Sequence, residues 1–315
     1  MSHFPAFLII AYQRNQNVIE LIETLSESGV SRVYVAIDGA KDFNNLSPKA
    51  PLSSQLKILQ DKKSLQLNIW QRERNLGPAV SVVTAIEWFF SREESGVILE
   101  DDLRLSKDSI MYFSGALDAF VNQKSVGIIS GSNFWGETGT QDSLPFSTYP
   151  LTWGWATWRD RWELLRRPFF HRHTFDFTSF TMLERCFWKT GIEKCIDRKL
   201  DAWDIPFAAN FKSLNLKAVI PRRNLVSNVG FDDYAGNTFE NVWPLNTPIT
   251  GSFCPGCKFA VSETLDITDK VKNDIYQITY ESALVRPFRS IQHLLRFRKW
   301  GHLQRAVNEV RIPAS

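Results

Sequence analysis

The chain has 315 residues, of which 43% are hydrophobic and 23% charged, as is typical of a soluble globular enzyme with an ample core. Its net charge of +3 is too small to indicate nucleic-acid binding, and no apolar run approaches the roughly 20 residues of a membrane span. The first eleven residues lack the basic region of a signal peptide, so we expect a cytoplasmic protein. The four cysteines, Cys254 and Cys257 among them, are then expected to be reduced thiols rather than a disulfide framework.

Strands and helices alternate over the first 130 residues. Apolar runs predict strands at residues 7–12, 33–37, 67–70, 97–99 and 126–130. Apolar residues at helical spacing predict a helix in each interval, with Pro78 and Ser106 placed to begin two of them. This alternation indicates βαβ units, and therefore an α/β fold with a mostly parallel sheet flanked by helices.

Three consecutive acids, Glu100, Asp101 and Asp102, follow the apolar run 97–99. Burying unpaired carboxylates inside the core is costly, so we expect the triplet just past the carboxyl end of the strand. Open α/β sheets bind ligands in the crevice at that end. Close acids repel one another unless a cation neutralises them, and oxygen ligands suit Mg²⁺ or Mn²⁺. A solvated acidic turn is the alternative interpretation.

Polar residues also follow the first two predicted strands. Arg14 comes after the first and Asp38 after the second, so both are expected at the same sheet edge as the acidic triplet. The turn after the first strand has no Gly-x-Gly-x-x-Gly motif, and the chain has no P-loop lysine signature. These absences count against a dinucleotide-dependent dehydrogenase and a P-loop nucleotidase.

Seven of the eleven tryptophans fall between Trp135 and Trp203. Their flat apolar rings with one polar edge suit carbohydrate, although we expect about half of them to lie in the core. Farther on, Asp201 and Asp204 precede a predicted helix start at 206–210, a strand is expected at 217–220, and 224–230 is expected to be a polar loop.

The expected organisation is one domain over 1–250 with an extension over 251–315. Residues 286–311 carry seven basic side chains against the single acid Glu309. If helical, this segment would be amphipathic. It could touch an anionic membrane surface, or it could pack on the domain as a solvated helix.

The segment 97–113 resembles the region around the Glu-Asp-Asp motif of the N-acetylglucosaminyltransferase I family, whose members are inverting, metal-dependent glycosyltransferases of the GT-A fold. The resemblance extends over about residues 5–235. Residues 10–14 are similar to the family's first strand with its phosphate-contacting arginine, and 36–39 to the segment whose aspartate holds uracil. Residues 149–158 resemble the tryptophan-containing region beside the donor sugar, and Trp203-Asp204 resembles a pair near the catalytic base.

The resemblance implies a role for each matched residue. Asp102 would bind Mn²⁺ or Mg²⁺, Glu100 and Asp101 would contact donor sugar and ribose, and Asp38 and Arg14 would contact base and phosphate. Trp155 would lie beside the donor sugar. Asp204 would be the general base, with Asp201 in reserve. The implied donor is a nucleotide-diphosphate sugar, most simply a UDP-sugar, and the implied acceptor a glycan or a lipid-linked oligosaccharide. The resemblance also implies that 1–250 divides into a nucleotide-sugar half (1–135) and an acceptor half (136–250).

Without a membrane anchor, the chain fits a bacterial hexosyltransferase of polysaccharide biosynthesis better than a Golgi enzyme. A sugar nucleotidyltransferase is the nearest alternative, but such enzymes carry a Gly-rich loop where this chain has Gln13-Arg14-Asn15. A non-catalytic carbohydrate-binding protein is the alternative from another class, in which the acids hold only a structural ion.

Overall fold

The computed structural model describes residues 4–39, 51–63, 65–140, 143–170, 174–230, 247–250, 259–278 and 301–313. Strands and helices alternate through the first 130 residues, as the sequence predicts. These elements are β1 (Ala6–Ala11), α1 (Asn15–Glu27), β2 (Arg32–Ile37), α2 (Leu52–Lys63), β3 (Gln66–Gln71), α3 (Pro78–Phe90), β4 (Ser95–Glu100), β5 (Leu103–Leu105), α4 (Lys107–Phe120) and β6 (Val126–Ser130).

The second half of the chain is richer in helix. Its elements are β7 (Leu144–Ser147), β8 (Trp155–Trp158), α5 (Arg159–Leu165), α6 (Arg167–Phe170), α7 (Met182–Ile196), α8 (Asp204–Ser213), β9 (Lys217–Val219), β10 (Val226–Asn228), β11 (Val261–Asp266), α9 (Thr268–Lys270), the π-helical turn η2 (Val271–Ile275) and α11 (Gly301–Asn308).

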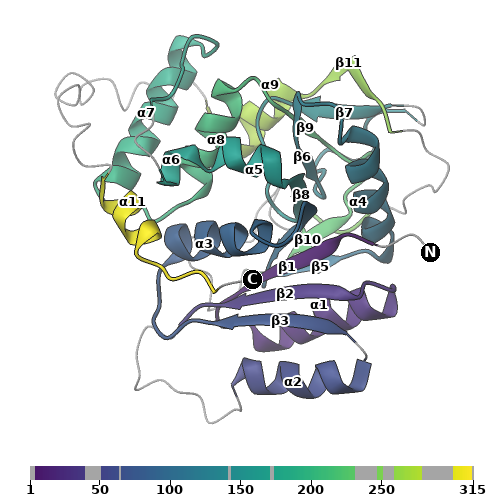
Figure 1. The fold of residues 1–315 in the computed structure, drawn as a ribbon. Helices are drawn as coiled ribbons and strands as arrows, with labels where there is room; N and C mark the ends of the chain where they lie inside the picture. The colour runs from purple at the N-terminus through teal and green to yellow at the C-terminus, as the bar shows by residue number, and fades with distance from the viewer. Residues whose placement is uncertain are drawn as a thin grey trace.

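Among the described residues, nine strands form one sheet in the order β11-β7-β9-β6-β8-β4-β1-β2-β3 (Figure 1). Neighbours run parallel from β4 through β1 and β2 to β3, and also in the pairs β6–β9 and β7–β11. Strand β8 is antiparallel to both β4 and β6, and β7 is antiparallel to β9. The predicted mostly parallel, Rossmann-like α/β fold is therefore confirmed.

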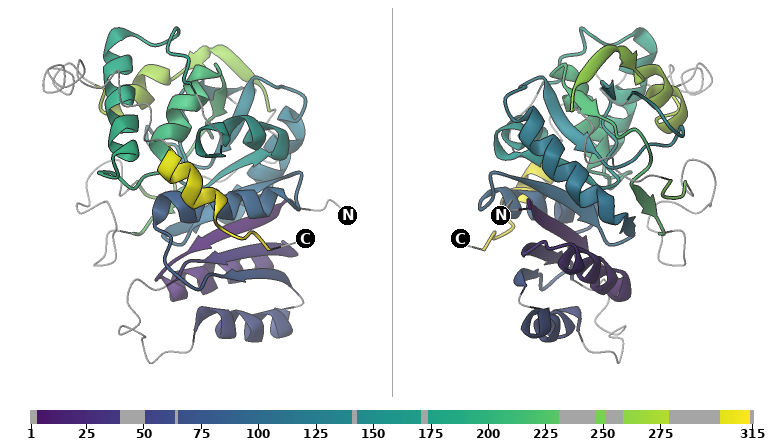
Figure 2. Two further views of the ribbon diagram at one scale, coloured as in Figure 1. Left: turned by 60° about the vertical axis from the view of Figure 1, so that its left-hand side comes forward. Right: turned by 90° about the vertical axis from the view of Figure 1, so that its right-hand side faces the viewer.

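Side chains of the central strands alternate between two hydrophobic layers, because successive residues of a strand point to opposite faces. On β1, Ala6, Leu8 and Ile10 pack with α3 and α5–α8. Phe7, Ile9 and Ala11 pack with α1, α2 and α4 on the other face. Figures 1 and 2 show these helices on the two sides of the sheet. The strands read as continuous apolar runs because both faces are covered.

The strand directions bring four chain segments to one edge of the sheet. Since β4 and β6 are both antiparallel to β8, they run the same way, and β1 and β2 run parallel to β4. Glu100, the last residue of β4, and the residues after these four strands, 12–14, 38–39, 101–102 and 131–135, therefore share what we call the site edge.

The later part of the chain differs from the expected organisation. Residues 226–228 of the expected polar loop form β10, which pairs with β5. Strand β11 joins the main sheet, and α11 packs against α3 and α6, so the sheet does not end at residue 250 (Figure 2). Cys254, Cys257 and most of the basic segment, including 286–300, lie outside the described residues.

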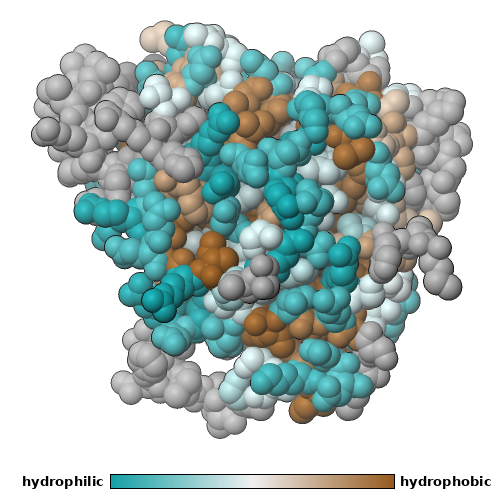
Figure 3. Space-filling model, viewed as in Figure 1, coloured by the Kyte–Doolittle hydropathy of each residue, from teal (hydrophilic) through white to brown (hydrophobic). Residues whose placement is uncertain are grey.

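Within the ranges given above, no helix is long and apolar enough to cross a membrane. The face shown in Figure 3 is mostly hydrophilic, and its hydrophobic residues gather in separate small patches. Cys186 and Cys195 are free thiols.

Candidate functional site

Asp101 fastens the turn after β1 to the end of β4. Its Oδ2 accepts hydrogen bonds from the backbone N–H groups of Tyr12 (2.7 Å) and Arg14 (3.4 Å), and its Oδ1 lies 3.5 Å from Arg14 Nη1. The Asp101 side chain is buried. This carboxylate therefore organises the site edge, and its predicted contact with the donor stays a prediction.

Asp102 faces the segment that follows β10. Asn228 Nδ2 donates to Asp102 Oδ2 (3.2 Å), and the Val229 N–H donates to the Asp102 carbonyl (2.7 Å). A Cβ on Gly230 would stand 2.6 Å from Asp102 Oδ2, so only glycine lets the backbone pass here. The Gly230 carbonyl in turn accepts from Arg14 Nη2 (3.3 Å). The paired strands β5 and β10 thus bring residues 228–230 onto the acidic triplet.

The acidic triplet is electrostatically strained. Burial and the neighbouring Asp101 carboxylate raise the pKa of Asp102 to about 6, against the opposing effect of Arg14. Burial and the charges of Asp102, Asp101 and Asp204 raise the pKa of Glu100 well above its ordinary value. Like charges in a partly buried site are unfavourable until a cation arrives.

Asp204 reaches this site from the start of α8. Trp203, the residue before it, stacks on Trp155 with ring centroids 6.1 Å apart, and Trp155 pairs with Ile98 of β4. Burial raises the pKa of Asp204, while backbone N–H groups of residues 204 and 205 lower it. The residue before α8, Trp203, makes no capping hydrogen bond, whereas the Asp204 carboxylate accepts from these two N–H groups at the start of the helix. The predicted base is thus brought beside the acidic triplet, and its role in proton transfer stays a prediction.

Asp201, predicted as the reserve base, contacts a helix, and its role as a base stays a prediction. Its Oδ1 accepts a hydrogen bond from the Ala79 N–H (3.1 Å) in the first turn of α3. Pro78 before it has no N–H, so Asp201 satisfies the first donor of that helix. Asp201 therefore caps α3, although it lies far from this helix in the sequence.

Asp38 lies at the end of β2 and is buried. Its carboxylate accepts from the backbone N–H groups of Gly39 (3.0 Å) and Leu76 (3.1 Å) and from Asn75 Nδ2 (3.2 Å). Burial raises its pKa, and the nearby Arg72 guanidinium is the largest opposing influence. The Leu76 N–H also reaches Oδ2 (3.2 Å), and a hydrogen bond from the Ser81 side chain lowers the pKa of Asp38 as well. These contacts hold the carboxylate in place, and its predicted contact with the nucleobase stays a prediction.

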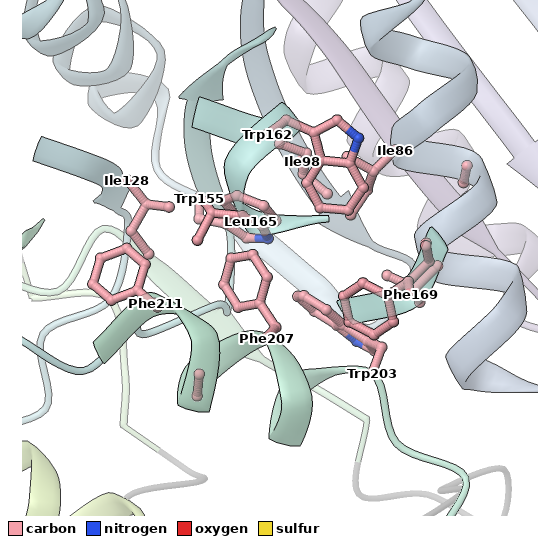
Figure 4. Close-up of a cluster of buried hydrophobic side chains, with 14 of the residues drawn as sticks. Ile86, Ile98, Ile128, Trp155, Trp162, Leu165, Phe169, Trp203, Phe207 and Phe211 are labelled. Atoms are coloured by element: carbon pink, nitrogen blue, oxygen red, sulfur yellow. The ribbon is translucent and has the colours of Figure 1, made fainter. Parts of the chain in front are cut away.

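Most of the described tryptophans are core residues. Trp155, the predicted donor contact, is 1% exposed and packs among Ile98, Trp203 and Phe207 (Figure 4). Its contact with the donor sugar stays a prediction, but its side chain supports the start of α8. Trp70, Trp88, Trp158, Trp162, Trp188 and Trp203 are buried as well. Trp135 and Trp153 are the two partly exposed tryptophans in the part of the chain that the structure describes.

The donor set fits a hard divalent cation shared with a ligand. Across the described ranges, no three His, Cys, Asp or Glu side chains converge as a ready-made metal cluster. Asp101 turns to residues 12–14, whereas Asp102 turns to 228–230, which is why the triplet does not converge. Mg²⁺ is commonly held by one or two carboxylates together with substrate phosphates. The strained Asp102 carboxylate, with a single side-chain donor, fits that arrangement.

Three contributors to the site were not predicted from the sequence: Asn75, Asn228 and Gly230. Each acts on a residue far from it in the chain, and Asn228 and Asp102 are 126 positions apart. The Asn-Val-Gly run at 228–230 is the one local signal, since it marks a turn. It does not reveal which carboxylate the turn meets.

A scan against protein-family models and a search of curated proteins found no match. Among solved structures, the chain is similar to TarS 1–349 of S. aureus, at 15% identity and a TM-score of 0.43, covering 72% of this chain and 61% of that chain. It is also similar to the mannosyltransferase PcManGT from Pyrobaculum calidifontis in complex with GDP-Man and Mn²⁺, at 15% identity and a TM-score of 0.37, covering 52% and 46%.

A third likeness is to the UTP-bound UGPase of Acinetobacter baumannii, at 7% identity and a TM-score of 0.35, covering 72% of this chain and 88% of that chain. All three TM-scores lie below 0.5. Function is therefore inferred from the residues of the site.

Proposed function

We propose that the protein is a metal-dependent glycosyltransferase of the GT-A type that moves a sugar from a nucleotide-diphosphate donor to a hydroxyl of a glycan, with inversion. The observation that carries the proposal is that Asp204, at the start of α8, lies close enough to Glu100 for its charge to help raise the pKa of Glu100, together with the charges of Asp102 and Asp101. A cation site and a second carboxylate in one place are what such a transfer requires.

In this proposal the site edge binds the donor along its length. Asp38 accepts an N–H of the base, Arg14 contacts the diphosphate, and Glu100 with Asp101 contacts the ribose and the sugar. Asp102 would hold Mn²⁺ or Mg²⁺. Bound there, the metal would stabilise the negative charge that develops on the departing diphosphate.

Asp204 is the proposed general base. The acceptor oxygen attacks the anomeric carbon, the bond from that carbon to the diphosphate breaks, and the hydroxyl proton passes to the Asp204 carboxylate. A carboxylate whose pKa is raised by burial accepts a proton more readily than an exposed one.

The test is to incubate the protein with UDP-sugars and to measure released UDP with Mn²⁺ and with a chelator. We expect UDP release that requires the metal and falls strongly in Asp102→Asn. Asp118→Asn, a substitution on α4 beside the start of β1, is the matched control and should behave as the parent. If pyrophosphate is instead released from UTP and a sugar phosphate, the protein is a nucleotidyltransferase. If neither reaction occurs with any nucleotide sugar, the proposal is wrong.

A further inference from the structure

Trp135 stands apart from the buried tryptophans. It belongs to the segment after β6, at the site edge, and it is half-buried and packed against the core. Its backbone N–H donates to Asn133 Oδ1 (3.0 Å), and Phe134 meets its ring edge-on with centroids 5.9 Å apart. The loop that carries Trp135 is therefore fixed, although the residue is not fully buried.

Trp153, the other partly exposed tryptophan, lies next to the same segment. Ser132 Oγ donates to the Trp153 carbonyl (2.7 Å), and Phe134 meets the Trp153 ring edge-on at 5.2 Å. Gly154 follows, and a Cβ there would stand 3.4 Å from Leu99, the residue before the acidic triplet. Trp135 and Trp153 therefore both pack on Phe134, in the segments that follow β6 and precede β8.

A segment from far along the chain fixes the orientation of Trp135. Its indole N–H donates to Asp274 Oδ2 (2.8 Å) on the π-helical turn η2. Two residues later, the Tyr276 hydroxyl donates to the Pro150 carbonyl (2.7 Å), and the Tyr276 ring packs on Tyr149 and Trp188. The turn after β11 thus holds both loops that carry the exposed rings. π-Helical turns are rare and often accompany functional sites.

We propose that Trp135 is a saccharide-stacking residue on the acceptor side of the site and that Asp274 is its positioning residue. An indole whose polar edge is already paired offers its flat surface to the apolar C–H face of a sugar ring. The inference rests on the proposed function, because it assumes that the acceptor sugar binds near the acidic triplet. It adds to that function the side chain that would bind the sugar, Trp135, and the segment that orients this side chain, the π-helical turn η2.

The experiment uses the full chain with UDP and Mg²⁺, and methyl glycosides of glucose, galactose and N-acetylglucosamine as probes. Saturation-transfer-difference NMR reports which sugar protons touch the protein, and calorimetry of UDP with Mg²⁺ reports the donor site in the same samples. We expect signals on the C–H face of at least one glycoside, lost in Trp135→Ala. Asp274→Ala should weaken that binding by about tenfold, as the loss of a hydrogen bond to a charged group would.

The controls separate positioning from folding. Asp274→Asn keeps an acceptor oxygen and should restore most of the binding, whereas Asp269→Ala, which removes an exposed partner of Lys272, should leave it unchanged. Trp135→Phe keeps a ring without the N–H, so adding Asp274→Ala to it should have little further effect. UDP binding should be the same in all these variants.

Two outcomes would overturn the inference: no glycoside signal in the parent protein, or a signal that survives Trp135→Ala. The proposed function fails separately, if UDP with Mg²⁺ does not bind the parent protein. Saccharide binding through Trp135 would then mark a carbohydrate-binding protein without the transfer activity.

Discussion

Replacing Asp201 by alanine tests whether Asp201 caps α3 while Asp204 acts as the general base. Asp201 Oδ1 accepts the Ala79 N–H at 3.1 Å, at the positive end of α3. The substitution leaves that N–H without its protein partner and removes a negative charge from the helix N-terminus. We therefore expect a loss of stability and little loss of chemistry.

The size of the effect follows from the contact. Losing a capping side chain costs about 1 kcal/mol, and losing the favourable charge at a helix end costs about 0.3–1 kcal/mol more. At about 2.1 cal/mol/K per residue, unfolding of a chain this long has an entropy of roughly 0.7 kcal/mol/K. The melting temperature should therefore fall by about 2–3 °C. Asp201→Asn keeps the acceptor and should lose only the charge contribution.

Calorimetric unfolding and the UDP-sugar transfer rate, measured on the same samples, give the answer. Asp201→Ala should melt earlier and turn over within about threefold of the parent, whereas Asp204→Asn should keep its stability and lose about 100- to 10,000-fold in rate. The reasoning is refuted if Asp201→Ala is as stable as the parent but nearly inactive, because Asp201 would then be the base.

Three further predictions concern the site edge and two glycines in the neighbouring turns. Asp38→Ala should bind uridine at least about tenfold more weakly than the parent, because a hydrogen bond to a charged carboxylate is lost. Equal affinities in titration calorimetry would mean that Asp38 serves only its contacts within the turn. In the metal-free protein, the raised pKa of Asp102 means that the folded state loses stability as the pH rises from about 4 to about 6 and Asp102 ionises. Asp102→Asn should therefore raise the free energy of unfolding above pH 6 by up to about 3 kcal/mol and leave it unchanged below pH 4. Urea unfolding that shows the same difference between the two proteins at every pH would contradict this. Gly154→Ala (φ 63°, Val226 at 3.0 Å) should lower the melting temperature more than Gly136→Ala (φ 76°, no neighbour within 4 Å), and equal losses would mean that crowding is unimportant.

The sequence predicts the first half of the fold well because strands covered on both faces appear as continuous apolar runs. The run 126–130 matches β6, and Ser106 caps α4 through the Ser109 N–H as expected. The second half is harder to predict because its strands are short and its helices interrupt them. The four-residue strand β8 carries two tryptophans in a segment that gives no strand period, although it joins β4 to β6.

The candidate site shows the same limit. Arg14, Asp38 and the acidic triplet could be placed at one edge, because parallel strands put their carboxyl ends together. What each carboxylate contacts could not be predicted. Asp101 pairs with the turn after β1, and Asp201 caps a helix 122 positions away from it, through contacts that only the folded chain creates. Only the structure reveals the bond from Trp135 to Asp274, for the same reason.

Calorimetric titration of UDP into the parent protein and into Asp102→Asn, each with Mn²⁺ and with a chelator, tests the central claim most directly. Asp118→Asn serves as the control because it removes a carboxylate beside Phe4 and Pro5 at the start of the chain. We predict that Mn²⁺ strengthens UDP binding in the parent and the control, and that it has no effect in Asp102→Asn. Binding that Mn²⁺ strengthens equally in all three proteins would contradict the assignment of Asp102 as the residue that holds the metal against the diphosphate.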